Sequence, residues 1–193
     1  MKKLKTEYNE VLLYFDFETV QINYYFEVYA VGCINDGQYI EFYGENSLSE
    51  FVTYLINNVR NKKLVAYNGG RFDFIILFKE LLKHSEIEIK NYLKNGARLL
   101  SYEFNGNTIM DLYNFTQSSL KDACNNYGLG KENSKKDINH EKINNWNDVY
   151  EHRNEISEYL KMDVVSMKEL YMLFNDMIYE KLKVNITEYL TLL

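Results

Sequence analysis

Two carboxylates, Asp16 and Glu18, stand two residues apart in this sequence. They belong to a segment, residues 11–17 and its continuation, where apolar and polar residues alternate with the period of a β-strand, so both carboxylates project from one face. Oxygens placed in this way can share a cation, which lies about 2.0 to 2.2 Å from each oxygen if it is magnesium. The pair predicts metal chemistry, although it is also compatible with a solvated strand face.

A second group of residues has the order Asn68, Gly69, Gly70, Arg71, Phe72, Asp73. A short apolar strand at 64–67 ends just before it, and the two glycines allow the backbone to approach another group closely. Asp73 then falls in the first turn of a helix, where a negative charge is favourable. Taken alone, the segment is typical of a turn followed by an ordinary helix N-terminus.

A third group consists of Tyr159 and Asp163 in a long helical pattern. Residues four apart share one face of a helix, so the hydroxyl and the carboxylate can address the same point. Taken alone, a tyrosine and an aspartate at this spacing are usually an ordinary solvent-exposed pair without a functional role. The three groups in this order favour a single site with four carboxylates and one tyrosine.

The elements that must position these residues follow from hydrophobic periodicity and turn residues. A hairpin with an Asn-Asp-Gly turn should follow the first strand, and Ser47 with Glu50 has the form of a capping box at the start of a helix. The long helix should be broken once. The expected strands are 11–17, 24–34, 39–43, 64–67, 98–104 and 108–113, and the expected helices are 47–59, 72–82, 118–127 and 149–183, with a surface loop at 128–147.

A strand-rich start followed by mixed helices and strands predicts a three-layer α/β domain around one mixed sheet. With 193 residues, 46% of them hydrophobic, the chain has the size of one globular domain. No long apolar run or secretory leader is visible, and the two cysteines form no zinc or disulfide pattern, so we expect a soluble, intracellular, cytoplasmic protein without a membrane partner. The net charge of −6 argues against binding nucleic acid by bulk attraction.

These segments resemble the three exonuclease motifs of family B DNA polymerases, especially the protein-primed enzymes of small phages and linear plasmids. The matching runs are residues 14–19, 68–73 and 159–163. Ser119 and Leu120 begin a run similar to the Ser/Thr-Leu motif of protein-primed polymerases, and Lys135 begins one similar to their Lys-x-x-hydrophobic motif. The resemblance covers about residues 11–175, nearly the whole chain.

The resemblance implies an RNase H-like exonuclease fold and a 3′-to-5′ exonuclease of the four-acid, tyrosine-containing (DEDDy) type. It implies that Asp16, Glu18, Asp73 and Asp163 hold two magnesium or manganese ions, and that Tyr159 orients the attacking water. Two such ions can activate a water and stabilise the departing 3′ oxygen. A phenol with an ordinary pKa near 10 is a poor general base at neutral pH, so positioning is the expected role of Tyr159.

The resemblance also implies the contacts with the nucleic acid. The matching positions are Thr19, Asn68, Phe72, Ser119, Leu120 and Lys135. Phe72 is suited to stacking on a base, and Lys135 to neutralising a phosphate. The expected substrate is the 3′ end of single-stranded DNA.

The resemblance stops at the polymerase itself, because the palm motifs of family B polymerases do not occur in these residues. We expect one exonuclease domain over 1–193 with an apolar tail at about 183–193, which docks on the domain or on a separately encoded DNA polymerase. Two alternatives remain. One is a non-catalytic single-strand-binding or regulatory subunit of such a polymerase, and the other is a 3′-to-5′ exoribonuclease.

Overall fold

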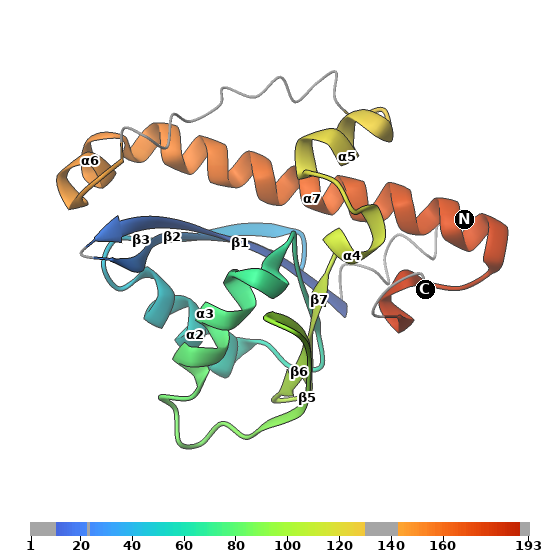
Figure 1. Cartoon of the computed structure of the whole chain (residues 1–193), viewed down its shortest axis with the longest axis horizontal. Helices are drawn as coiled ribbons and strands as arrows, with labels where there is room; N and C mark the ends of the chain where they lie inside the picture. The colour runs from blue at the N-terminus through green and yellow to red at the C-terminus, as the bar shows by residue number, and fades with distance from the viewer. Residues whose placement is uncertain (1–10, 23, 130–142, 190–193) are drawn as a thin grey trace.

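A seven-stranded mixed sheet forms the centre of the computed structural model, which describes residues 11–22, 24–129 and 143–189 (Figure 1). The strand order is β3-β2-β1-β4-β7-β6-β5. The pairs β1·β4 and β4·β7 are parallel, whereas β1·β2, β2·β3, β5·β6 and β6·β7 are antiparallel. The strands are β1 (Leu12–Ile22), β2 (Tyr25–Asn35), β3 (Gln38–Tyr43), β4 (Lys63–Ala66), β5 (Ile89–Asn95), β6 (Arg98–Phe104) and β7 (Asn107–Asp111).

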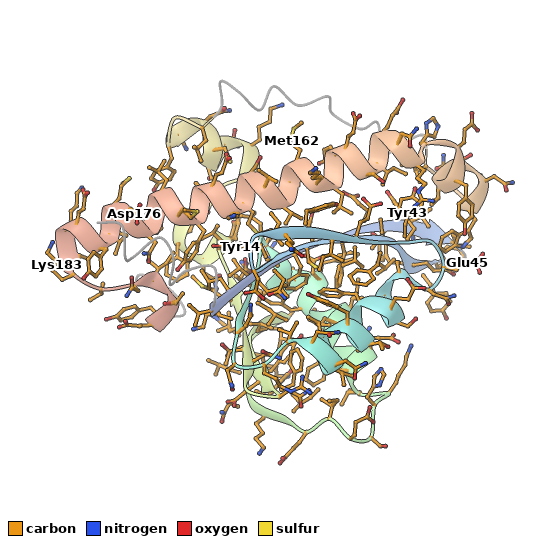
Figure 2. All side chains as sticks on the ribbon, turned by 180° about the vertical axis from the view of Figure 1, so that it is seen from behind. Tyr14, Tyr43, Glu45, Met162, Asp176 and Lys183 are labelled. Atoms are coloured by element: carbon orange, nitrogen blue, oxygen red, sulfur yellow. The ribbon has the colours of Figure 1, made fainter. Side chains whose placement is uncertain are left out.

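Helices cover both faces of the sheet, so the expected three-layer α/β architecture is confirmed. The helices α2 (Ser47–Asn58) and α3 (Asp73–Leu81) lie on one face. The other face carries α4 (Tyr113–Thr116), α5 (Leu120–Asn126), α6 (Trp146–Glu151) and α7 (Arg153–Leu182). The helix α7 crosses the whole domain, with Met162 near its middle and Lys183 just past its end in the reverse view of Figure 2.

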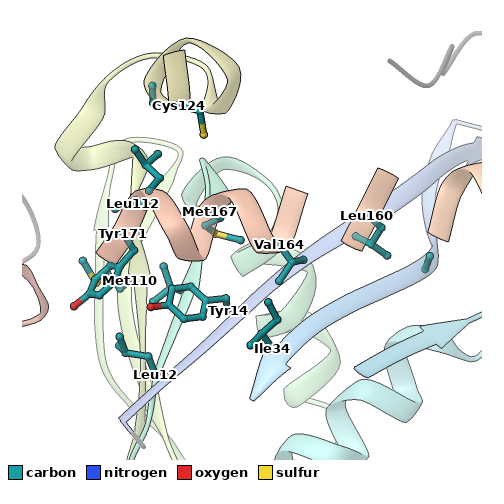
Figure 3. Packing of buried hydrophobic residues seen from close by; sticks show 14 of the residues in the cluster. Leu12, Tyr14, Ile34, Met110, Leu112, Cys124, Leu160, Val164, Met167 and Tyr171 are labelled. Carbon is teal, nitrogen blue, oxygen red and sulfur yellow. The ribbon is translucent and has the colours of Figure 1, made fainter. Parts of the chain in front are cut away.

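The alternation expected in the first strand divides the core into two halves. Phe15 and Phe17 pack with α2 and α3 in one cluster of buried residues, whereas Tyr14 packs under α7 in the other. Figure 3 shows Tyr14 facing Val164 and Tyr171 of α7, and the Tyr14 and Tyr171 rings lie 5.7 Å apart. Burial of large apolar side chains on both faces fixes which residues of β1 point toward α7.

Turn chemistry also agrees with expectation at the β2–β3 hairpin. Asp36 and Gly37 both have positive φ, 50° and 79°, as the favoured two-residue hairpin turns require. The long helical pattern is interrupted once, at His152 between α6 and α7, as expected.

Three local expectations were wrong or incomplete. The Ser47 hydroxyl donates to the carbonyl of Val28 at 3.1 Å instead of capping α2, whose N-cap is Asn46, so the capping box does not form. The edge strand β5 was missed because its residues are nearly all exposed and show no alternation. The single-turn helix α4, which begins at Tyr113, the last residue of the predicted strand 108–113, was not expected.

The last described residues fold back onto the domain. Ile186, in the 3₁₀ turn η3 (Ile186–Glu188), is fully buried, and its N–H donates to Asn175 Oδ1 of α7 at 2.9 Å. Lys63 of β4 donates to the carbonyl of Thr187. The tail therefore docks on this domain as far as Tyr189. In the described part of the chain, no helix combines the length and apolarity that a bilayer crossing requires.

Candidate active site

The β1 strand presents two of the four predicted acids on the face that α7 covers. Asp16 is half-buried and Glu18 is buried. A β-bulge interrupts the pairing with β2 directly after Glu18, so that Glu18 pairs with Ala30 but Thr19 with Val28. Such bulges turn the side chains that follow and are common beside functional sites. The buried hydroxyl of Tyr29, the bulged residue, faces Glu18, and burial together with this carboxylate raises the pKa of Tyr29.

The helix α7 brings Tyr159 and Asp163 to the same place because β2 has no side chain where the helix crosses it. Gly32 pairs with Asp16 in the antiparallel register. A Cβ at Gly32 would lie 2.8 Å from Leu160 Cγ and 2.9 Å from the Tyr39 hydroxyl, closer than real Cβ contacts. Glycine at this position therefore permits the close approach of α7 to β1.

The turn after β4 delivers the fourth acid. Asn68 adopts a left-handed conformation (φ 59°), the 3₁₀ turn η1 (Gly69–Arg71) follows, and Asp73 is the buried first residue of α3. Gly70 leaves no room for a side chain, since its Cβ would meet the Leu99 carbonyl at 2.7 Å. Gly70 thus allows the expected close backbone approach, to the strand β6, whereas a Cβ at Gly69 would meet the side chains of Ala66 and Phe74 at 3.0 Å.

A carboxylate that the sequence analysis did not select holds this turn in place. Asp111, buried at the end of β7, accepts hydrogen bonds from the N–H groups of Asn68 (2.8 Å) and Gly70 (3.1 Å). It also accepts one from the Tyr113 N–H (3.1 Å) and forms a 2.7 Å ion pair with Arg98 of β6. Asp111 reaches the turn because β4 and β7 are parallel, so that their carboxyl ends meet at one edge of the sheet.

Electrostatic interactions show that the four predicted acids are neighbours. The pKa of Asp16 is raised well above its usual value, first by burial and then by the charges of Asp73, Glu18 and Asp163 in that order. Burial is also the main cause that raises the pKa of Asp73 to about 7, with a smaller contribution from Asp111 and an opposing one from the Asp73 N–H. Negative charge concentrated in a buried site is typical of functional positions.

Tyr159 belongs to the same site. Burial raises its pKa above the ordinary value, and the charges of Asp163, Glu18 and Asp16 and a hydrogen bond to Asp163 act in the same direction. The phenol therefore stays protonated at neutral pH and is a hydrogen-bond donor. In this form the hydroxyl donates hydrogen bonds and is not a base.

The donor set is the kind that magnesium and manganese prefer, because all of its ligands are carboxylate oxygens. The carboxylates around Asp16 repel one another, and a divalent cation would offset their negative charge. Within 11–22, 24–129 and 143–189, no three acidic, histidine or cysteine side chains converge closely enough to hold a metal ion as they stand. The residue types fit the cation, whereas its coordination geometry is not defined.

Five of the six predicted nucleic-acid contacts lie in the described residues, in two places. Thr19 follows the bulge and is half-buried, Asn68 is exposed, and half-buried Phe72 packs edge-on against Phe26 with ring centroids 5.1 Å apart, so these three flank the acids. Ser119 caps α5 by accepting the Asp122 N–H at 3.1 Å, and Leu120 packs against the core under α7.

Lys135 lies outside the described residues. The roles of all six residues in nucleic-acid binding stay predictions.

The model of the family described as DNA polymerase type B, organellar and viral, matches residues 53–192, more than half of the chain. The chain belongs to this family. A DNA polymerase of Kluyveromyces lactis is 27% identical over 124 residues, which cover 59% of this chain and 12% of that protein. The DNA-directed DNA polymerase of Enterobacteria phage PRD1 is 27% identical over 172 residues, which cover 88% of this chain and 28% of that polymerase.

The fold of this chain is similar to that of part of a polymerase whose structure has been solved. The orthorhombic crystal form of Phi29 DNA polymerase superposes with a TM-score of 0.69 at 17% identity, covering 94% of this chain and 32% of that one. Phi29 DNA polymerase complexed with single-stranded DNA gives 0.66 at 18% identity, covering 87% and 32%. The resemblance to protein-primed family B polymerases is confirmed, and the chain spans about a third or less of the length of each protein it matches.

Proposed function

We propose that this chain is a metal-dependent exonuclease that removes nucleotides from the 3′ ends of single-stranded DNA. The observation that carries the proposal is that Asp73 of α3 and Asp163 of α7 lie close enough to Asp16 and Glu18 of β1 for their charges to act on Asp16. A solvated strand face does not draw two further carboxylates from other segments toward its own pair, because burying like charges together is unfavourable.

Asp16, Glu18, Asp73 and Asp163 would hold two divalent cations, magnesium or manganese. When bound, these cations supply an activated water and stabilise the departing 3′ oxygen of the scissile phosphate. Asp16 would lie central among these ligands, since its pKa responds to the charges of all three other acids. The cations would relieve the repulsion that raises this pKa.

Tyr159 would position the attacking water. Its hydroxyl already donates a hydrogen bond toward Asp163, and its raised pKa keeps the proton on the oxygen. A donor fixed in this way orients a water molecule without removing its proton, so the contribution of Tyr159 is to geometry. The proton released by the water then has to leave through another acceptor or through solvent.

DNA is the proposed substrate because the matched proteins are DNA polymerases, and one Phi29 structure is described as a complex with single-stranded DNA. Phe72 and Asn68 flank the acids, where a terminal nucleotide would have to lie. A proofreading role beside a separately encoded DNA polymerase would place the same chemistry in replication. The RNA-specific alternative differs only in substrate and is separated by the same assay.

The test is a gel assay of the purified protein on 5′-labelled single-stranded DNA and RNA, with magnesium, manganese or chelator. We expect a metal-dependent ladder that shortens from the 3′ end of DNA and is absent from Asp16→Ala/Glu18→Ala. The matched control is Asp176→Ala/Glu180→Ala, which removes two exposed carboxylates of α7 far from the site. It should digest DNA like the unmodified protein.

Two results would reject the proposal. Cleavage that survives in the Asp16/Glu18 double variant would remove these residues from the chemistry. A folded protein that binds DNA but yields no ladder with either metal would be a binding module.

A further inference from the structure

A groove of about 900 Å³ opens on the outer side of the Asp73 turn, between the tip of the β1–β2 hairpin and the exposed face of α3. Phe72 lines this groove, and the next residue in the chain is Asp73 of the four-acid site. The groove and the site are therefore adjacent. Its volume lies within the range of about 300 to 1,000 Å³ that ligand pockets occupy.

Aromatic side chains form one wall of the groove. They are Tyr24, Tyr25, Phe26, Phe72 and Trp146. The first three are consecutive and are 94%, 75% and 56% exposed, which is unusual for such large side chains. Phe26 meets Phe72 edge-on at 5.1 Å, so the exposed run continues directly into the residue beside Asp73.

The tip of the β1–β2 hairpin carries one of these rings. Ile22 pairs with Tyr25, so Tyr24 lies in a two-residue turn, and its φ of 69° is the left-handed conformation that such turns require. This conformation costs a bulky L-residue about 1 to 2 kcal/mol, which glycine or asparagine would avoid. The turn therefore holds an aromatic ring in solvent, where it adds nothing to the core.

The charged residues of the groove are three cations, Arg71, Lys79 and Lys83, and three acids. Arg71 and Lys79 are exposed on the groove, and among the described residues neither takes part in an ion pair. The acids are Glu27, Glu45 and Glu80. Glu27 accepts the Trp146 indole N–H at 3.1 Å, and Glu80 is paired with Lys83 at 2.6 Å.

Arg71 and Lys79 thus stand out as cations available to a ligand in a protein whose net charge is −6.

We infer that this groove holds the single-stranded segment that lies 5′ to the terminal nucleotides while the 3′ end occupies the four-acid site. The inference rests on the proposed function for the position of the 3′ end. Exposed rings stack on bases of any sequence, and separated cations contact phosphates along the backbone, which is the combination that single-strand binders use. The groove also contains the apolar residues Val28, Leu48, Ile75 and Ile76. The exposed cations Arg71 and Lys79 are what distinguish it from a purely apolar patch for a folded protein partner.

The experiment measures binding separately from cleavage. Fluorescence anisotropy of labelled oligothymidylates of about 4 and about 12 nucleotides, in chelator at low salt, compares a ligand confined to the site with one that also fills the groove. Tyr25→Ala/Phe26→Ala should weaken binding of the longer ligand about 5- to 150-fold, the equivalent of one stacking contact of about 1 to 3 kcal/mol. Binding of the shorter ligand should weaken less, since it is affected only through the contact of Phe26 with Phe72.

A second variant protects the test against misfolding, because Phe26 packs on Phe72. Lys79→Glu alters only an exposed side chain, and it should lower the affinity for the longer ligand. It should also reduce the steepness of log K against log salt by about 0.7 for each phosphate that is no longer neutralised. The matched controls are Tyr189→Ala and Lys181→Glu, exposed residues near the opposite end of α7. Figure 2 shows that end, marked by Lys183, far from Glu45 of the groove.

The outcomes separate this inference from the proposed function. The inference would be overturned if the groove variants and the controls bound the longer ligand with equal affinity, or if neither ligand bound at all. If the same preparation still produced a DNA ladder, the proposed exonuclease activity would stand. Loss of affinity in the groove variants, in a protein that cleaves nothing, would support the groove and reject the exonuclease.

Discussion

Replacing Asp73 by asparagine should stabilise the protein in the absence of cations. The Asp73 carboxyl has a pKa of about 7 in the folded chain and about 3.8 when unfolded. An acid whose pKa is raised by folding binds its proton more tightly in the native state, so stability falls as pH rises from the unfolded pKa through the folded one. Asparagine stays neutral throughout and does not incur this loss.

The magnitude follows from the two pKa values. At 1.36 kcal/mol per pKa unit, the advantage of Asp73→Asn grows from about 0.5 kcal/mol at pH 4 to about 4 kcal/mol at pH 8. For a chain of this size, about 4 kcal/mol corresponds to a rise in Tm of roughly 8 to 16 °C. The figure is an upper bound, because the carboxylate also accepts a hydrogen bond from its own N–H that the amide would make more weakly.

The assay is thermal unfolding in chelator at pH 4, 6 and 8, repeated with magnesium. Bound cations should raise the Tm of the unmodified protein at pH 8 and narrow its gap to Asp73→Asn. The control, Asp176→Asn, changes an exposed carboxylate of α7 and should shift stability by less than about 0.5 kcal/mol. A Tm for Asp73→Asn below that of the unmodified protein at pH 8, or a gap that does not depend on pH, would refute the electrostatic reasoning.

Three further substitutions test the framework of the site. Asp111→Ala should cost about 3 to 5 kcal/mol in urea unfolding, because it leaves the Arg98 charge buried without its partner, and a loss under about 1 kcal/mol would show that the pair is dispensable. Gly32→Ala should lower stability by about 1 to 3 kcal/mol and DNA cleavage with it, since the added methyl group meets Leu160; unchanged cleavage would mean that α7 can move away without harm. Tyr159→Phe should slow cleavage while calorimetry still detects manganese binding, and equal turnover would assign the water to another residue.

Much of the site could be predicted because its signals are local. Alternation in β1 placed Asp16 and Glu18 on one face and the phenylalanines on the other, and helical spacing placed Tyr159 with Asp163. The position of Asp111 could not be found in this way. In the sequence it is one more acid at a strand end, and its function depends on the parallel pairing of β4 with β7, which brings it to Asn68, 43 residues earlier in the chain.

The contacts of Gly32 and Ser47 could not be predicted from the sequence for the same reason. The role of Gly32 exists only in the register that sets it beside Asp16 under α7, and nothing next to it in the sequence indicates a helix crossing. Ser47 has the neighbours of a capping residue, but tertiary structure brings the Val28 carbonyl within reach of its hydroxyl and that bond forms instead. Local patterns predict faces and elements, whereas contacts between distant strands decide which side chain holds which loop.

The anchoring of the Asn68 turn by Asp111 has a consequence for how the protein folds. Few hydrogen bonds within the turn hold it in shape. The N–H groups of Asn68 and Gly70 donate to the Asp111 carboxylate, which comes within reach only after β4 and β7 have paired. Pairing between strands far apart in the chain is slow, because the entropy of closing the loop is lost before the contacts between the strands stabilise the pair. Asp73 should therefore reach its final position in the last stages of folding, and cation binding in a refolding experiment should lag behind the formation of helices.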